Sequence, residues 1–254
     1  MIHPTAVVEA GAQIAPDVEI GPYCVIGAEV EIDSGTKIGP HVVIHGRTRI
    51  GQRNQIYQFA SIGEANQDKK YQGEPTETII GNDNVIREFV TIHRGTVQDR
   101  GVTRIGDDNL LMAYVHVAHD CVIGNHCILA NNATLAGHVH LDDWVILGGF
   151  TGIHQFCRIG AHAFTSISAS ILKDVPPYVM ADGQPAKPRG LNTEGLRRRG
   201  FSADDIQVIK RAYKLLYRSQ LPLQEALEQI VQMKSPLTEP LVTFIRESQR
   251  GIIR

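Results

Sequence analysis

Aliphatic residues recur at every sixth position over the first two thirds of the chain. The frame starts at Ile2 and reaches Ile171, and 25 of its 26 first positions are aliphatic, with Thr165 the exception. The fifth position of each hexad mostly holds a small or β-branched residue, such as Ala60 or Val90. A period of six excludes an α-helix, because helical patterns repeat every 3.6 residues. Three hexads, 18 residues in all, form one triangular coil, and such coils stack about 4.8 Å apart. We therefore expect residues 1–190 to form a mainly β structure, a parallel β-helix.

The frame is interrupted twice. Extra residues fall at about 68–79 and 98–104, after the hexads that begin at Ile62 and Ile92. Both hexads belong to the same column of the coil. Loops that leave a regular scaffold often carry function.

The repeat ends near residue 190, and helical signals follow. Ser202 with Asp205 three residues later predicts a capping box that opens a helix through about Tyr217. Pro222 and Pro236 mark the starts of two further segments. We expect residues 191–254 to form a small α-helical domain.

Composition and the N-terminus indicate in which compartment we expect the protein. Only 6% of the residues are aromatic, and no apolar run approaches the ~20 residues of a membrane span. The N-terminus lacks the pattern of a signal peptide, so we expect a cytoplasmic protein. All the cysteines fall at inward fifth positions, so they are expected to be buried rather than nucleophilic: Cys24, Cys121, Cys127 and Cys157.

Charge is distributed unevenly along the chain. Residues 1–172 carry a net charge of −7, whereas residues 173–254 carry +5. The basic part is either a solvated helical surface or a docking site for an acidic partner.

The frame also places polar residues in columns. His119 is a third-position residue, and Arg94, Gly137 and Gln155 occupy the same position on neighbouring coils. Asp120 is followed one coil later by His138, and His93 and His154 flank the column. Together they predict one polar strip beside both insertions.

Two kinds of chemistry fit this strip. A histidine beside a carboxylate is suited to act as a general base. A zinc site of the kind found in β-helical carbonic anhydrases would instead need three converging imidazoles. A solvated strip or a subunit interface is the non-catalytic alternative.

Several stretches closely resemble one family of the hexapeptide-repeat acyltransferases, the UDP-N-acetylglucosamine O-acyltransferases. The resemblance covers essentially the whole chain. The stretches that carry it are Ile56–Glu64, Thr91–Thr96, Ala118–Cys121, Ala130–His138, His154–Cys157 and Gly195–Phe201.

The resemblance implies a left-handed β-helix and a homotrimer with a cleft between neighbouring copies. It implies transfer of a 3-hydroxyacyl chain from acyl carrier protein to the glucosamine 3-hydroxyl of UDP-N-acetylglucosamine, in lipid A synthesis. No metal, cofactor, nucleic acid or membrane span is expected. The related N-acyltransferase is the alternative, although that enzyme normally carries an extra N-terminal domain.

Roles follow by matching positions. His119 corresponds to the family's base, Asp120 to its partner, and the Gly137 amide to the oxyanion donor. Ile167 matches a position that is glycine in some relatives, so we expect a short acyl chain of about ten to twelve carbons. Substrate-binding residues match at Asp68, Lys70, His93, His116, His138, His154, Gln155, Ile167, Asn192 and Arg198.

Overall fold

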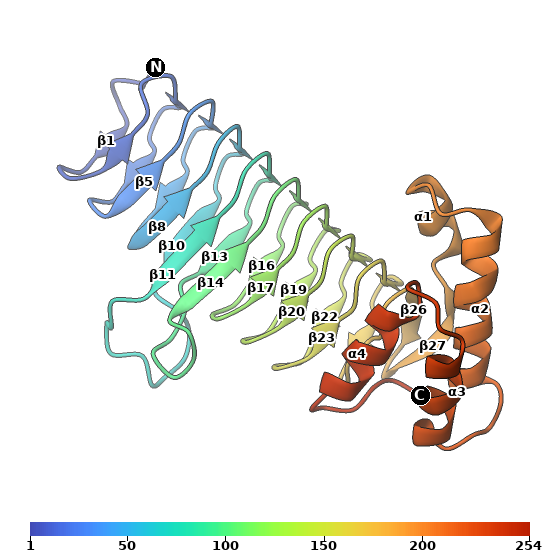
Figure 1. Cartoon of the computed structure of the whole chain (residues 1–254). Coiled ribbons are helices and arrows are strands. Elements are labelled where there is room, and N and C mark those ends of the chain that lie inside the picture. Colours follow the sequence, from blue (N-terminus) through green and yellow to red (C-terminus); the bar gives the residue numbers. More distant parts are fainter.

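The computed structural model describes residues 1–254 and shows a long triangular coil with helices at one end (Figure 1). Parallel strands form three sheets, one along each side of the triangle. Up to β25, neighbouring strands in a sheet are three strands apart in the chain, so each coil adds one strand to each side. The fold is a left-handed parallel β-helix. This confirms the parallel β-helix predicted from the six-residue frame and the left hand expected from the family resemblance.

Most strands are only two residues long, as expected for hexads that turn a corner every six residues. Sheet 1 contains β1 (Val7–Val8), β4 (Val25–Ile26), β7 (Val43–Ile44), β10 (Ser61–Glu64), β13 (Thr91–His93), β16 (His116–Val117), β19 (Thr134–Leu135), β22 (Gly152–Ile153) and β25 (Ser170–Ile171). Sheet 2 contains β2 (Gln13–Ile14), β5 (Val30–Ile32), β8 (Arg47–Ile50), β11 (Glu77–Ile80), β14 (Val102–Ile105), β17 (Val122–Ile123), β20 (His140–Leu141) and β23 (Arg158–Ile159). Sheet 3 contains β3 (Glu19–Ile20), β6 (Lys37–Ile38), β9 (Gln55–Ile56), β12 (Val85–Ile86), β15 (Leu110–Leu111), β18 (Ile128–Leu129), β21 (Ile146–Leu147), β24 (Phe164–Thr165), β26 (Val179–Gly183) and β27 (Ala186–Leu191).

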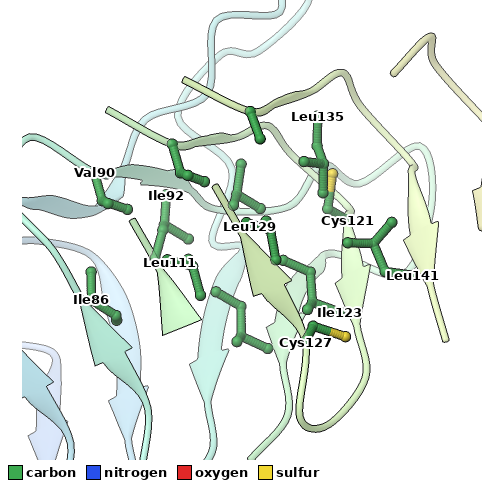
Figure 2. Close-up of a cluster of buried hydrophobic side chains, with 14 of the residues drawn as sticks. Ile86, Val90, Ile92, Leu111, Cys121, Ile123, Cys127, Leu129, Leu135 and Leu141 are labelled. Atoms are coloured by element: carbon green, nitrogen blue, oxygen red, sulfur yellow. The ribbon is translucent and has the colours of Figure 1, made fainter. Parts of the chain in front are cut away.

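First-position residues of the hexads fill the interior of the coil. Ile92 and Leu135 point inward from sheet 1 and Leu111 from sheet 3, and all three are fully buried (Figure 2). The four cysteines are unpaired and buried, as predicted. Thr165, the one polar first position, is accommodated because its hydroxyl bonds the Thr151 hydroxyl at 2.8 Å.

Corners between the sheets have a constant backbone geometry. The fourth residue of hexad after hexad adopts a positive φ, for example 59° at Asp120 and 62° at His138. This left-handed conformation turns the chain at the corner. We name the corners by the sheets they join. His119 and Asp120 lie on the 1–2 corner, between β16 and β17.

Both long loops leave the coil at the 1–2 corner. β10 ends at Glu64 and β11 begins at Glu77, so the first loop spans 65–76, slightly earlier than the 68–79 expected. The second spans 94–101 rather than 98–104, because β14 already begins at Val102. The observed loop boundaries differ from the predicted ones because β11 and β14 are four residues long and pair with each other from Glu77 and Val102 onward.

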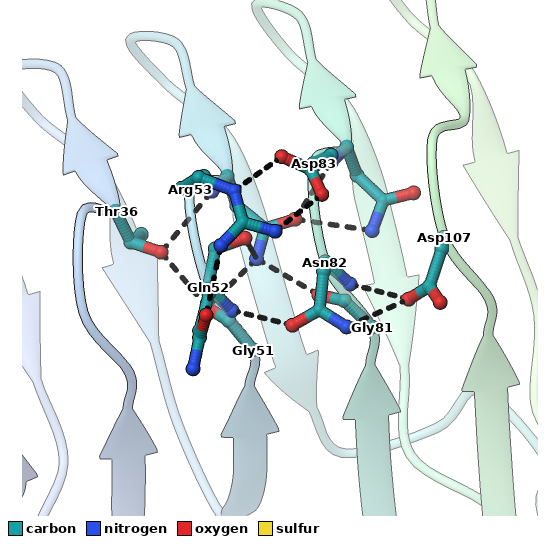
Figure 3. A network of polar contacts seen from close by, with 10 residues as sticks. Thr36, Gly51, Gln52, Arg53, Gly81, Asn82, Asp83 and Asp107 are labelled. Carbon is teal, nitrogen blue, oxygen red and sulfur yellow. Dashed lines mark hydrogen bonds and ion pairs between the residues drawn. The ribbon is translucent and has the colours of Figure 1, made fainter.

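The 2–3 corner is held by a polar ladder (Figure 3). The Asn82 side chain accepts a hydrogen bond from the Gln52 amide at 2.8 Å, and Asp107 accepts one from the Asn82 amide at 2.6 Å. Arg53 and Asp83 form an ion pair at 2.7 Å on its exposed side. Side chains therefore satisfy the corner amides here, which marks this corner as structural.

Beyond β25 the coil is capped by an antiparallel hairpin of β26 and β27 and by four helices. The Ser202–Asp205 capping box is present, whereas the first short helix was not predicted. No helix is long and apolar enough to cross a membrane. The helices are α1 (Thr193–Arg198), α2 (Ala203–Tyr217), α3 (Leu223–Gln232) and α4 (Glu239–Glu247).

Candidate active site

His119 and Asp120 form a hydrogen-bonded pair on the 1–2 corner. Nδ1 of His119 lies 2.9 Å from Oδ2 of Asp120, and the two side chains are 13% and 0% exposed. Because an ionised carboxylate only accepts, this contact places the proton on Nδ1 and leaves Nε2 free to take another. The pair has the arrangement of a general base with an orienting partner.

Thr96 fixes the carboxylate from the second loop. Its backbone amide lies 2.9 Å and 3.1 Å from the two Asp120 oxygens, and its hydroxyl donates to Oδ2 at 2.6 Å. Burial alone would raise the pKa of Asp120, but the hydrogen bonds from His119 and Thr96 outweigh it and lower the pKa. Asp120 is therefore charged near neutral pH, although the residue as a whole is only 4% exposed.

Gly137 lies directly beneath the His119 ring, one coil further along. A Cβ at this position would stand 2.5 Å from Cε1 and 2.6 Å from Nε2 of His119. The Gly137 carbonyl accepts from the Phe156 amide at 3.1 Å, whereas its own amide donates to no protein group. A free donor thus lies beside the free nitrogen of the base, where a substrate oxyanion could be stabilised.

His138 packs against this pair. Its ring meets the His119 ring edge-on at 5.0 Å and stacks on Phe156 at 4.4 Å. Nε2 of His138 lies 3.9 Å from Oδ2 of Asp120. Nδ1 lies 2.8 Å from Oδ2 of Asp99, a residue of the second loop.

His93 and His116 form a second group on the outer face of sheet 1. Their rings meet edge-on at 5.0 Å, and Nδ1 of His116 lies 2.7 Å from the Thr91 hydroxyl. Burial and the neighbouring His116 lower the pKa of His93 to about 4, and burial also lowers the pKa of His116. Both imidazoles are therefore neutral near pH 7 and can donate or accept one hydrogen bond to a ligand.

The first loop is tied to the same corner. Arg94 donates to the Gly63 carbonyl at 2.9 Å and to the Tyr71 hydroxyl at 3.4 Å. Asp68 is partly buried and accepts from the Lys70 amide at 3.0 Å, while the Lys70 side chain is exposed. The loop therefore presents an exposed cation at Lys70.

Gln155 and His154 extend the strip by one coil. β19 and β22 pair Leu135 with Ile153, which places Gln155 in register with Gly137 as the frame predicted. His154 is exposed, and its Nδ1 lies 3.1 Å from the Gln155 carbonyl.

Three predicted site residues lie away from the 1–2 corner in the same chain. Ile167 is 70% exposed on the 3–1 corner. Asn192 caps α1 by accepting from the Gly195 amide at 3.1 Å, and it donates to the His162 carbonyl on the 2–3 corner at 3.0 Å. Arg198 is an exposed residue of α1 that pairs with Glu194 at 3.0 Å. A single chain does not bring these residues to the strip.

Metal binding at the strip can be judged from its donors. One ligand atom each of His119, Asp120 and His138 lies within 4.8 Å of the others. This set has two imidazoles and a carboxylate, not the three imidazoles of a carbonic anhydrase site. His119 and Asp120 bond each other through Nδ1 and Oδ2, an arrangement that suits proton transfer.

Thr96 and Asp99 were not identified from the sequence. Asp99 lies in the predicted insertion, where the frame gives no position, and the frame gave Thr96 only an inward fifth position in the hexad of Ile92, so no column placed either residue beside Asp120 or His138. The only available signal was that the insertion follows a hexad of the polar strip.

Two protein families match the chain. Residues 174–253 match domain 2 of UDP-N-acetylglucosamine O-acyltransferase, and residues 1–34 and 103–137 match the bacterial transferase hexapeptide repeat. The first match covers the helical end of the chain, and the second covers parts of the coil.

Full-length relatives agree with both matches. An acyl-[acyl-carrier-protein]–UDP-N-acetylglucosamine O-acyltransferase of Thiobacillus denitrificans is 60% identical over 100% of this chain and 99% of the relative. The solved UDP-N-acetylglucosamine O-acyltransferase of Moraxella catarrhalis is 51% identical with a TM-score of 0.97, covering 100% of this chain and 99% of that one. The solved UDP-N-acetylglucosamine acyltransferase of Francisella novicida is 47% identical with a TM-score of 0.98, covering 100% of this chain and 94% of that one. With the coil, the strip and the helical end all accounted for, this chain belongs to the UDP-N-acetylglucosamine O-acyltransferase family.

Proposed function

We propose that the protein transfers a (R)-3-hydroxyacyl chain from acyl carrier protein to the glucosamine 3-hydroxyl of UDP-N-acetylglucosamine, the first step of lipid A biosynthesis. The observation that carries the proposal is the oriented His119–Asp120 pair above the free amide of Gly137. The names of the relatives supply the substrates.

Each catalytic residue has one task in this reaction. Nε2 of His119 removes the proton from the sugar 3-hydroxyl while the hydroxyl oxygen attacks the thioester carbon. The Gly137 amide stabilises the resulting oxyanion. When the C–S bond breaks, the departing pantetheine thiolate accepts from His119 the proton that His119 removed from the sugar. Asp120 stabilises the imidazolium that exists between these two steps.

The carrier protein is proposed to dock on the basic helical end. Arg211 and Lys214 of α2 and its C-cap residue Arg218 border a cavity of about 520 Å³ that also contacts Leu215 and Met233. Cations beside an apolar surface suit an acidic helical partner.

We also propose a homotrimer in the cytoplasm. Ile167 lies on the 3–1 corner and Arg198 in α1, whereas His119 lies on the 1–2 corner, so a neighbouring copy would be needed to bring such residues to one cleft. Four free cysteines fit a reducing compartment.

The product of purified enzyme tests the function. 3-Hydroxyacyl carrier protein is incubated with UDP-N-acetylglucosamine or, separately, with UDP-3-O-acylglucosamine, and the product bond is identified by mass spectrometry and alkaline hydrolysis. The proposal predicts that a new alkali-labile ester forms on the first acceptor and that the second acceptor is not acylated. An alkali-stable amide formed on the second acceptor would instead identify the N-acyltransferase.

A further inference from the structure

Asp99 is the one residue of the second loop that contacts an imidazole of the polar strip. Its Oδ2 lies 2.8 Å from Nδ1 of His138, although the two residues are 39 positions apart in the sequence. The side chains are 35% and 12% exposed, so the contact is partly shielded from water. It differs in this respect from His126 and Asp108 on the 2–3 corner, whose side chains also meet at 2.7 Å but are 37% and 66% exposed.

The loop that carries Asp99 is itself held in place. The Asp99 and Gly101 amides both donate to the Thr96 carbonyl, at 3.3 Å and 3.1 Å. Thr96 in turn holds Asp120 through its amide and hydroxyl. One turn of chain therefore positions both the partner of His119 and the partner of His138.

The geometry gives the Asp99 contact a specific consequence. With Nδ1–H donated to Asp99, the other nitrogen of His138 faces Oδ2 of Asp120 at 3.9 Å, too far for a hydrogen bond. That oxygen is the one that His119 uses at 2.9 Å. Without this anchor nothing in the second loop would hold the His138 ring, and its nearest acceptor would be the Asp120 oxygen 3.9 Å away that His119 uses.

We propose that Asp99 is a positioning residue for acyl transfer, which holds His138 away from Asp120 so that the carboxylate stays bonded to His119. The inference rests on the proposed function, since it assigns a role within that reaction. It also gives the second loop a task beyond closing the chain, because the loop supplies the anchors of two neighbouring histidines.

A double-mutant cycle tests the proposal. Asp99→Ala should lower kcat/KM by on the order of 10-fold to 100-fold, the usual cost of losing a partner that orients an active histidine. In a His138→Ala background the same substitution should change kcat/KM by less than about twofold. Asp99→Asn, whose amide oxygen still accepts from Nδ1–H, should restore most of the activity. Asp108→Ala is the matched control and should leave turnover unchanged.

A spectroscopic readout is independent of turnover. Nitrogen NMR of the imidazoles should show His138 in the Nδ1–H form in the wild-type protein and in Asp99→Asn, and a changed form in Asp99→Ala. If Asp99→Ala does not fold, Asp99→Ser takes its place in both experiments.

Two results would overturn the proposal. Wild-type activity in Asp99→Ala would show that the anchor is not needed. An equal loss with and without His138 would show that Asp99 only supports the loop. If the wild-type enzyme transferred no acyl chain, the proposed function would fail instead, and the NMR signals would still decide whether Asp99 orients His138.

Discussion

Replacing Gly137 by alanine places a methyl group where the imidazole of His119 lies. The added carbon would stand 2.5 Å from Cε1, 2.6 Å from Nε2 and 3.1 Å from Nδ1 of that ring. Non-bonded carbon atoms rest at about 3.5–4.0 Å, so the ring must retreat by about 1 Å. The φ of Gly137 lies outside the left-handed region, so alanine adds no backbone strain there.

The displaced ring determines the size of the effect. A shift of 1 Å in a catalytic group can cost about 100-fold in rate, and the move also stretches the hydrogen bond to Asp120. We expect kcat to fall by about 10²–10³-fold, which corresponds to about 3–4 kcal/mol in activation free energy. The expected loss is kinetic, with the folded structure retained.

Initial rates of acyl transfer at saturating substrates measure this effect, with a thermal melt to confirm folding. Gly27→Ala is the matched control, because its Cβ would meet Nδ1 of His45 at an ordinary 3.4 Å on the same corner. The control should keep wild-type kcat. A Gly137→Ala enzyme within about threefold of the wild-type kcat would refute the placement of the base above Gly137.

Other outcomes follow from the same structure. Burial lowers the pKa of His93 to about 4. As pH falls below about 6.5, the unfolded chain therefore binds a proton at this histidine that the native protein does not bind. The free energy of unfolding should drop between pH 6.5 and 4, and denaturant titrations should show a shallower drop in His93→Asn. Ile167→Gly should shift preference from donors of ten to twelve carbons toward fourteen by on the order of tenfold, whereas a wild-type enzyme that used a fourteen-carbon donor faster than a ten-carbon one would contradict the role of Ile167. Dialysis against a chelator should leave turnover unchanged, and stoichiometric zinc in the purified protein with loss of activity on its removal would contradict proton transfer without a metal.

The six-residue frame predicted much of this structure because its period converts directly into stacking. Val117, Leu135 and Ile153 pair across neighbouring coils, so His119, Gly137 and Gln155 had to share one column. The same argument placed both loops on that corner and every cysteine inside.

What the frame could not give lies outside the repeat. Thr96 and Asp99 bond Asp120 and His138 from a loop of irregular backbone, which no periodicity describes. Likewise, Asn192 is matched by resemblance to a ligand contact, yet in this chain it caps α1. Such contacts depend on tertiary folding, which the residue pattern alone does not reveal.

The most direct test of the account is the rate of acyl transfer by His119→Ala, compared with His126→Ala. Both histidines contact an aspartate within the chain, at 2.9 Å and 2.7 Å, but they lie on different corners. Removing a general base should lower kcat/KM by about 10²–10⁴-fold, whereas the His126 variant should match the wild type. Undiminished transfer by His119→Ala would contradict the claim that the 1–2 corner is the active site.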